Sequence, residues 1–259
     1  MRTPKSLKRM FQLAAAAAIT LGTMLPATGS AAENMIGRQS QNEGIHEPTD
    51  CGNLLLWLDA SDLDGDGTAK GLSEQGLSGN SILFWTDKAT GQTLTPPAAI
   101  NRPTYLTNAL NGKAVVQFDG KNNYFPMRQL STIRTVFWVL RENPSASYMR
   151  FLLGDSSTLH FCRSEQKHFW GTASPFVTGG SLRVTEVVKD GQATYVPTSW
   201  SIISLITTGN VSANQITRDR TFDNRSWHGE IAELIIYSKP LTDTERTNVY
   251  NYLKAKWGL

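Results

Sequence analysis

Short segments rich in β-branched and aromatic residues recur along most of this chain and are separated by glycine-containing turns. The pattern is typical of strands joined by tight turns, because a helix would instead repeat its apolar residues every three or four positions. Turn signals such as Asn111-Gly112 and Asp119-Gly120 lie between the segments. Eight segments predict strands: residues 54–58, 82–86, 114–118, 135–141, 151–153, 159–162, 182–188 and 201–207. The sequence therefore predicts an all-β domain.

The predicted strand over residues 135–141 is apolar on both faces. Successive side chains of a strand point to opposite faces, so Trp138 lies on one face and Phe137 and Val139 lie on the other. Such strands belong inside a two-layer sandwich or under a covering helix.

One helix is predicted, near residue 250. Thr242 can cap its first turn, and Glu245 completes a capping box. Val249, Leu253 and Trp257 then recur every four residues and form an apolar stripe. We expect this helix to pack on the sheets.

The first 32 residues have the organisation of a secretory signal peptide. Basic residues in the first nine positions precede an apolar stretch over residues 10–25, and small residues end at Ala32. An uncleaved membrane anchor is the alternative. Residues 33–50 are polar and aperiodic, which predicts a flexible leader, and residues 51–259 form one domain. We expect a protein secreted to the periplasm or the cell exterior, with no stable membrane insertion after signal cleavage.

Cleavage after residue 32 changes the charge of the protein. It removes four of the 25 Lys and Arg residues and none of the 22 Asp and Glu residues, which leaves a net charge of −1. A nearly neutral chain without a basic stripe has no general attraction to nucleic acid or to anionic membranes. Nucleic acid is therefore not an expected partner.

Export also determines how the two cysteines are interpreted. Cys51 and Cys162 are the only cysteines in the sequence, and an oxidising compartment permits a disulfide between them. Two separate buried thiols are the alternative, because sequence does not show whether the two Cα atoms approach each other.

Seven segments resemble, in order, the laminin-G-like, concanavalin A-like domain of secreted bacterial proteins. They are 55–62 (LLWLDASD), 85–91 (WTDKATG), 101–105 (NRPTY), 110–120 (LNGKAVVQFDG), 229–237 (GEIAELIIY), 241–246 (LTDTER) and 252–257 (YLKAKW). The resemblance covers roughly residues 51–259 and is loose over about 142–200. It implies an all-β jelly-roll sandwich of two antiparallel sheets, to which the predicted C-terminal helix is added. It implies little about activity, because that fold carries lectins, adhesion modules, glycosidases and lyases.

An acidic loop is the sharpest local motif. Asp62, Asp64 and Asp66 alternate before Gly67, as in the first half of an EF-hand loop, and carboxylate oxygens are the ligands that calcium prefers. The twelfth position is Ser73 instead of Glu, so the expected form is a looser calcium loop, completed by Asp59 or by a backbone carbonyl. A solvated Asp-Gly turn is the alternative.

Glu230 and Glu233 are the carboxylates that a glycosidase interpretation would use. A retaining glycosidase needs two carboxyl groups about 5–5.5 Å apart. A spacing of three along a strand sends these two side chains to opposite faces. The spacing instead favours a structural Glu233, paired with a cation or a backbone donor.

Aromatic residues near turns are the candidate sugar contacts, because sugars stack on exposed rings beside polar groups. Trp227 is the first candidate for an exposed ring, with core packing as the alternative. The predicted ligand-binding set is Trp227, Trp170, Tyr124 and Arg225.

These observations predict a secreted, non-catalytic module that binds a glycan or another cell-surface component, with calcium as its one expected cofactor. Two alternatives stay open. The first is a glycoside hydrolase or polysaccharide lyase on the same fold. The second is a structural or adhesion module whose partner is a protein.

Overall fold

The computed structural model describes residues 46–68, 79–157, 160–218 and 220–259. The predicted signal peptide lies outside these residues, as does most of the predicted leader. Residues at the end of that leader are folded: η1 (Pro48–Cys51) is a 3-10 helix, and the Tyr237 hydroxyl donates a hydrogen bond to the carbonyl of Pro48 at 2.9 Å. The folded part therefore begins before residue 51.

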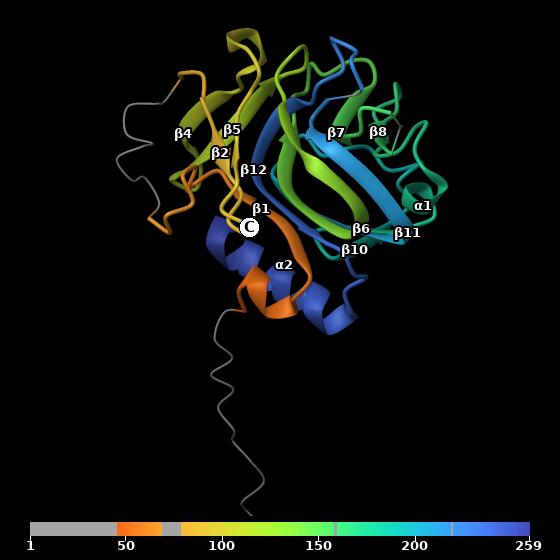
Figure 1. Ribbon diagram of the computed structural model, residues 1–259. Helices are drawn as coiled ribbons and strands as arrows, with labels where there is room; N and C mark the ends of the chain where they lie inside the picture. Colours follow the sequence, from red (N-terminus) through yellow and green to blue (C-terminus); the bar gives the residue numbers. More distant parts are fainter. Residues whose placement is uncertain (1–45, 69–78, 158–159, 219) are drawn as a thin grey trace, which may run out of the picture. The chain divides into compact units, whose positions relative to one another are not determined.

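Ten of the strands in the described residues form one antiparallel sheet (Figure 1). Its main path runs in the order β10, β9, β11, β6, β12, β5, β4, with β1 beside β12, β7 beside β11 and β8 beside β7. The strands are β1 (Leu54–Asp59), β4 (Thr104–Leu110), β5 (Lys113–Asp119), β6 (Phe125–Glu142), β7 (Arg150–Gly154), β8 (Phe161–Arg163), β9 (Ser181–Val184), β10 (Val187–Lys189), β11 (Ser201–Ile216) and β12 (His228–Tyr237). A second, small sheet pairs β2 (Trp85–Thr86) with β3 (Thr93–Leu94). Short helical turns η2 (Ala99–Asn101) and α1 (Pro175–Thr178) lie in connections.

Strand β12 has paired strands along both of its edges. One edge of β12 pairs with β6 along its length. The other edge pairs with β5 at residues 228–231 and with β1 at residues 233–237. Two segments from opposite ends of the sequence, β1 and β12, therefore lie side by side.

The sheet has apolar side chains on both faces, as the pattern of residues 135–141 predicts. Trp138 and its alternate neighbours in β6 pack into the larger cluster of buried side chains. Phe137 and Val139 belong to a second cluster, which contains Leu253 and Trp257 of α2 (Asp243–Trp257). Helix α2 therefore covers one face of the sheet, and Figure 1 shows it next to β1.

The predicted helix is confirmed. Thr242 accepts a hydrogen bond from the backbone N–H of Glu245, and the Glu245 carboxylate accepts one from the N–H of Thr242. The helix ends before Gly258, whose φ of 67° is left-handed and suits glycine.

Each predicted segment contains residues of a strand, but several strands differ in length from the prediction. Strands β6 and β11 are much longer than predicted, and the segment over 82–86 pairs only at Trp85 and Thr86. The predicted single strand over 182–188 is a hairpin of β9 and β10, because Thr185 and Glu186 both have positive φ (47° and 64°) and reverse the chain. The start of the segment predicted over 159–162 lies outside the described residues, and β8 begins at Phe161.

The all-β, antiparallel fold class and the C-terminal helix are thus confirmed. No helix in the described ranges is long and apolar enough to cross a membrane.

Candidate functional site

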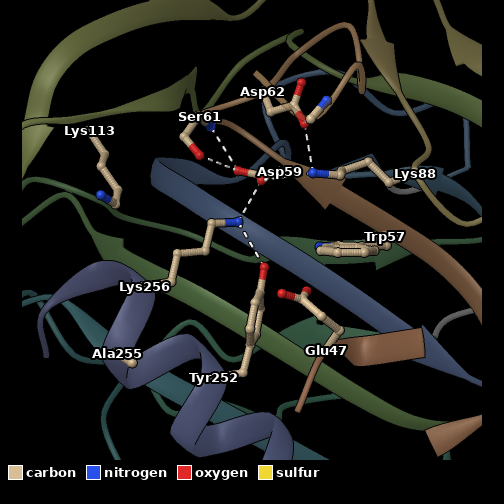
Figure 2. Close-up of a pocket in the computed structure, with 11 residues that line it drawn as sticks. Glu47, Trp57, Asp59, Ser61, Asp62, Lys88, Lys113, Tyr252, Ala255 and Lys256 are labelled. Carbon is tan, nitrogen blue, oxygen red and sulfur yellow. Dashed lines mark hydrogen bonds and ion pairs between the residues drawn. The ribbon is translucent and has the colours of Figure 1, made fainter. Parts of the chain in front are cut away.

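A pocket of about 430 Å³ lies between the end of β1 and the last turns of α2 (Figure 2). It is called the Asp59 pocket here. Its lining comes from segments far apart in the sequence: Glu47, Trp57, Asp59, Ser61, Asp62, Gly67, Lys88, Lys113, Tyr252, Ala255 and Lys256. The pairing of β1 with β12, together with the packing of α2 across them, brings these segments together.

Asp59 is the central acid of the pocket. It is the last residue of β1 and is 2% exposed. Its Oδ1 accepts hydrogen bonds from the backbone N–H and the hydroxyl of Ser61, at 2.9 and 2.6 Å. Its Oδ2 faces two ammonium groups, Lys256 at 2.5 Å and Lys88 at 3.5 Å. The turn after β1 therefore fixes the carboxylate, and two lysines neutralise it.

Lys88 links β1 to the acidic loop. Its ammonium lies 2.6 Å from Oδ2 of Asp62 and 4.7 Å from the centroid of the Trp57 ring. Its backbone N–H donates to the carbonyl of Trp57, while the Trp57 N–H donates to the Asp87 carboxylate, both at 2.8 Å. The segment 85–91 is thus bound to β1 by backbone contacts, and Figure 2 shows Lys88 between Trp57 and Asp62.

Glu233 lies beneath the pocket and is fully buried. The indole N–H groups of Trp57 and Trp257 donate to its two carboxylate oxygens, each at 2.6 Å. The Tyr252 hydroxyl donates at 3.0 Å, and the Lys256 ammonium lies at 2.8 Å. Four donors meet one carboxylate, which is the arrangement that buried charge requires. The prediction of a structural Glu233 paired with a cation is confirmed.

The charges in the pocket stabilise one another. Burial alone would raise the pKa of Asp59, but Lys256, Ser61 and Lys88 outweigh burial and hold that pKa below its ordinary value. Burial opposes the charge on Lys256, yet Glu233 and Asp59 outweigh it and raise the pKa of Lys256. Burial raises the pKa of Glu233, against the opposing effect of Lys256. Asp59 and Lys256 are therefore an ionised pair at neutral pH.

The prediction that Glu230 and Glu233 face opposite sides of the sheet is wrong. The pairing of β12 with β6 shifts register between Ile231 and Glu233, and this β-bulge returns Glu233 to the face that Glu230 occupies. Glu230 contacts Arg141 at 2.8 Å and Gln117 at 2.9 Å. Each glutamate thus contacts one cation and at least one neutral donor. Neither glutamate lines the Asp59 pocket.

The acidic loop brings three of the four predicted metal ligands together. Oxygen atoms of Asp62, Asp64 and Asp66 lie within 4.8 Å of one another. Oδ1 of Asp62 is buried and has no hydrogen-bond partner among the described residues, which suits a cation ligand. The other Asp62 oxygen is bound by Lys88 and by the N–H of Gly67. Asp59 is not in this group, because lysines and Ser61 take up its oxygens.

Two of the four predicted ligand-binding residues lie in the core. Trp227 is fully buried, so the prediction of an exposed ring is wrong: the ring packs in the larger apolar cluster. Trp170 is 2% exposed in the same cluster. Tyr124 is half-buried under the guanidinium of Arg218, 4.3 Å away. Arg225 is half-buried beside the exposed ring of Phe222, at 4.6 Å. None of the four lines the Asp59 pocket.

No disulfide joins Cys51 and Cys162 in the described residues, where both cysteines are buried. The Cys51 thiol lies 3.9 Å from the carbonyl of Glu245, at the start of α2. The Cys162 thiol lies 3.4 Å from the carbonyl of Arg163, in β8. The structure therefore has the alternative, two separate buried thiols: Cys51 belongs to the apolar cluster under α2, whereas Cys162 lies in β8.

The lysines of the pocket were not predicted. Lys88, Lys113 and Lys256 lie in three separate segments, and only the tertiary fold brings them together. One signal is present in the sequence: Lys256 immediately precedes Trp257, so it lies at the edge of the apolar stripe that faces the sheet. No protein-family model matches the chain, and a search of curated proteins found no match.

Proposed function

We propose that this chain is a secreted, non-catalytic carbohydrate-binding domain with a laminin-G-like jelly-roll fold, and that the Asp59 pocket holds a neutral saccharide. The observation that carries the proposal is the balance of charge around the pocket. Three carboxylates (Glu47, Asp59 and Asp62) and three ammonium groups (Lys88, Lys113 and Lys256) line it.

A lining of this kind favours a polar ligand without net charge. Equal numbers of acids and amines give no overall attraction for an anion or a cation. They do present both hydrogen-bond acceptors and donors, which is what adjacent hydroxyl groups of a sugar need. The Trp57 ring adds an apolar wall to the same pocket.

The arrangement of the resembling segments supports the fold part of the proposal. Residues 55–62 and 229–237 contain the paired strands β1 and β12, and residues 252–257 supply Tyr252 and Lys256 to the pocket. Three of the seven resembling segments thus meet at the proposed site. The apolar clusters on both faces of β6 are what an inner strand of a jelly-roll needs.

The experiment is a thermal-shift screen of the protein against neutral polysaccharides, followed by calorimetric titration of any that bind. A ligand at a hundred times its Kd adds about 2.7 kcal/mol of stability, or roughly 5–10 °C in Tm for a domain of this size. Lys113→Ala removes one ammonium from the pocket rim and should weaken binding about tenfold. Lys189→Ala removes an exposed lysine of β10 and is the matched control.

Binding by the wild type that Lys113→Ala weakens and Lys189→Ala leaves unchanged would support the proposal. The absence of any shift would contradict it and favour the protein-binding alternative. Release of reducing ends or of unsaturated sugars from a bound polysaccharide would contradict the non-catalytic part.

We also propose that calcium stabilises the acidic loop. The grouping of the Asp62, Asp64 and Asp66 oxygens and the unpartnered Oδ1 of Asp62 support this, while Lys88 on the other Asp62 oxygen opposes it. Tm should rise with calcium relative to EDTA, and the combined Asp64→Ala and Asp66→Ala variant should lose that rise. An equal rise in the variant would place the calcium elsewhere.

A further inference from the structure

A second pocket, of about 460 Å³, lies where the loop between β6 and β7 meets the loop before β12. It is called the Phe222 pocket here, and Ser147, Tyr148, Arg150, Phe222, Asp223, Asn224 and Arg225 line it. It shares no lining residue with the Asp59 pocket.

Two exposed aromatic rings distinguish this pocket. Tyr148 is 57% exposed and Phe222 is 46% exposed. The Phe222 ring is held by two guanidinium groups, Arg225 at 4.6 Å and Arg220 at 4.7 Å. An exposed ring fixed in a polar pocket is a surface on which the apolar face of a sugar ring can pack.

Buried arginines fix the backbone on both sides of the pocket. Arg150 is 7% exposed and donates hydrogen bonds to the carbonyls of Gly120, at 2.7 Å, and Asn224, at 2.5 Å. Arg163 is fully buried; it donates to the carbonyl of Tyr148 and pairs with Glu142. The two loops are therefore held in place before any ligand arrives, which lowers the entropy cost of binding.

The charge of the Phe222 pocket differs from that of the Asp59 pocket. Arg150 and Arg225 line it against one acid, Asp223, which is itself 3.3 Å from Arg218. Nε of Arg150 is buried and has no hydrogen-bond partner among the described residues. Two guanidinium groups against one carboxylate in the lining favour a ligand that carries an anionic oxygen.

The acids nearest to Arg150 are already bound. Glu142 pairs with Arg163. Oδ1 of Asp119 accepts hydrogen bonds from the backbone N–H groups of Lys121, Asn122 and Asn123.

We infer that the Phe222 pocket binds an acidic saccharide, one that carries carboxylate or sulfate groups. The Phe222 and Tyr148 rings pack against the sugar, and Arg225 and Arg150 pair with its anionic group. The inference rests on the proposed function in one respect, that the domain binds saccharides, and it concerns a different pocket.

The test is calorimetric titration of the whole protein with oligogalacturonate, with a sulfated oligosaccharide, and with the methyl ester of the same oligogalacturonate. The ester keeps the sugar ring and removes the charge, so it should bind about tenfold more weakly. Arg225→Gln and Phe222→Ala should each weaken binding of the acidic form by about tenfold. Affinity should also fall as salt is added, because the contact is between charges.

Two matched variants control for general effects. Phe176→Ala removes a phenylalanine of nearly equal exposure, 47%, from α1. Arg128→Gln removes an exposed arginine of β6 by the same substitution. Both should bind the acidic saccharide as the wild type does.

Equal binding by the wild type, Arg225→Gln and Phe222→Ala would overturn the inference, as would equal affinity for the acid and its ester. A wild type that binds neither acidic saccharide would also overturn it. If Lys113→Ala loses the acidic saccharide and Arg225→Gln keeps it, the ligand occupies the Asp59 pocket and only this inference fails. If the wild type binds an acidic saccharide but no neutral one, the proposed neutral-saccharide site in the Asp59 pocket is refuted, whereas the acidic-saccharide site in the Phe222 pocket is supported.

Discussion

Replacing Lys256 by methionine removes the ammonium that contacts both Asp59 and the buried Glu233 beneath the pocket. Lys256 lies 2.5 Å from Asp59 and 2.8 Å from Glu233, and it also donates to the Tyr252 hydroxyl at 3.0 Å. Asp59 would keep Ser61 and the more distant Lys88, and Glu233 would keep its indole and hydroxyl donors. Two carboxylates with almost no exposure would then lack their closest cation.

The expected loss is about 3–5 kcal/mol of unfolding free energy at neutral pH, because removing one partner of a buried ion pair leaves the other charge uncompensated. Most domains have only about 5–15 kcal/mol in total, so urea unfolding should show the change plainly. Lys254→Met is the matched control, since Lys254 is an exposed lysine of the same helix. The control should change stability by less than about 1 kcal/mol.

The loss should also depend on pH, with a sign that follows from the pKa shifts. In the wild type the lowered pKa of Asp59 gives stability that is present at neutral pH and disappears only as pH falls through the folded pKa. The raised pKa of Lys256 gives stability that disappears only as pH rises through its folded pKa. In Lys256→Met the buried carboxylates can take up protons, so the loss should shrink between about pH 8 and about pH 5. A loss below about 1 kcal/mol, or one that is the same at both pH values, would refute this account of the pocket.

Three further predictions concern the rest of the fold. Trp227→Ala should lower the unfolding free energy, measured by urea unfolding, by about 3–5 kcal/mol, because the ring is fully buried. A loss below about 1 kcal/mol would contradict the burial of this ring. Thiol titration of the unfolded protein, purified without reductant, should find two thiols per chain, and a value near zero would show that Cys51 and Cys162 are bonded. Gly229→Ala should lower the unfolding free energy by about 1–3 kcal/mol in the same assay, because the added Cβ would clash with the carbonyl oxygen of Arg141. Unchanged stability would show that β12 can shift to accept the methyl group.

Local patterns predicted the elements that depend on near neighbours in sequence. The Thr242–Glu245 capping box and the stripe through Trp257 located α2, since both are set within a few residues. Alternation in β6 predicted apolar clusters on both faces. The reversal at Thr185 and Glu186 was missed, because neither residue is one that usually adopts positive φ.

The site was harder to predict, because it depends on register and on distant pairing. The β-bulge at Ile231 and Glu233 has no sequence signal, and one inserted residue changed the face on which Glu233 lies. Asp59 was identified as a metal ligand, whereas lysines from two other segments neutralise it. The polar neighbours of Trp227 indicated exposure, yet its ring enters the core.

The contact between Asp59 and Lys256 joins positions 197 residues apart. A ribosome that adds about 5–20 residues per second needs about 10–40 seconds to pass from one to the other. During that interval the strand carrying Asp59 has been made but the helix that covers it has not. The pocket is thus assembled late in synthesis, and an intact contact between Asp59 and Lys256 would show that both ends of this long separation have met.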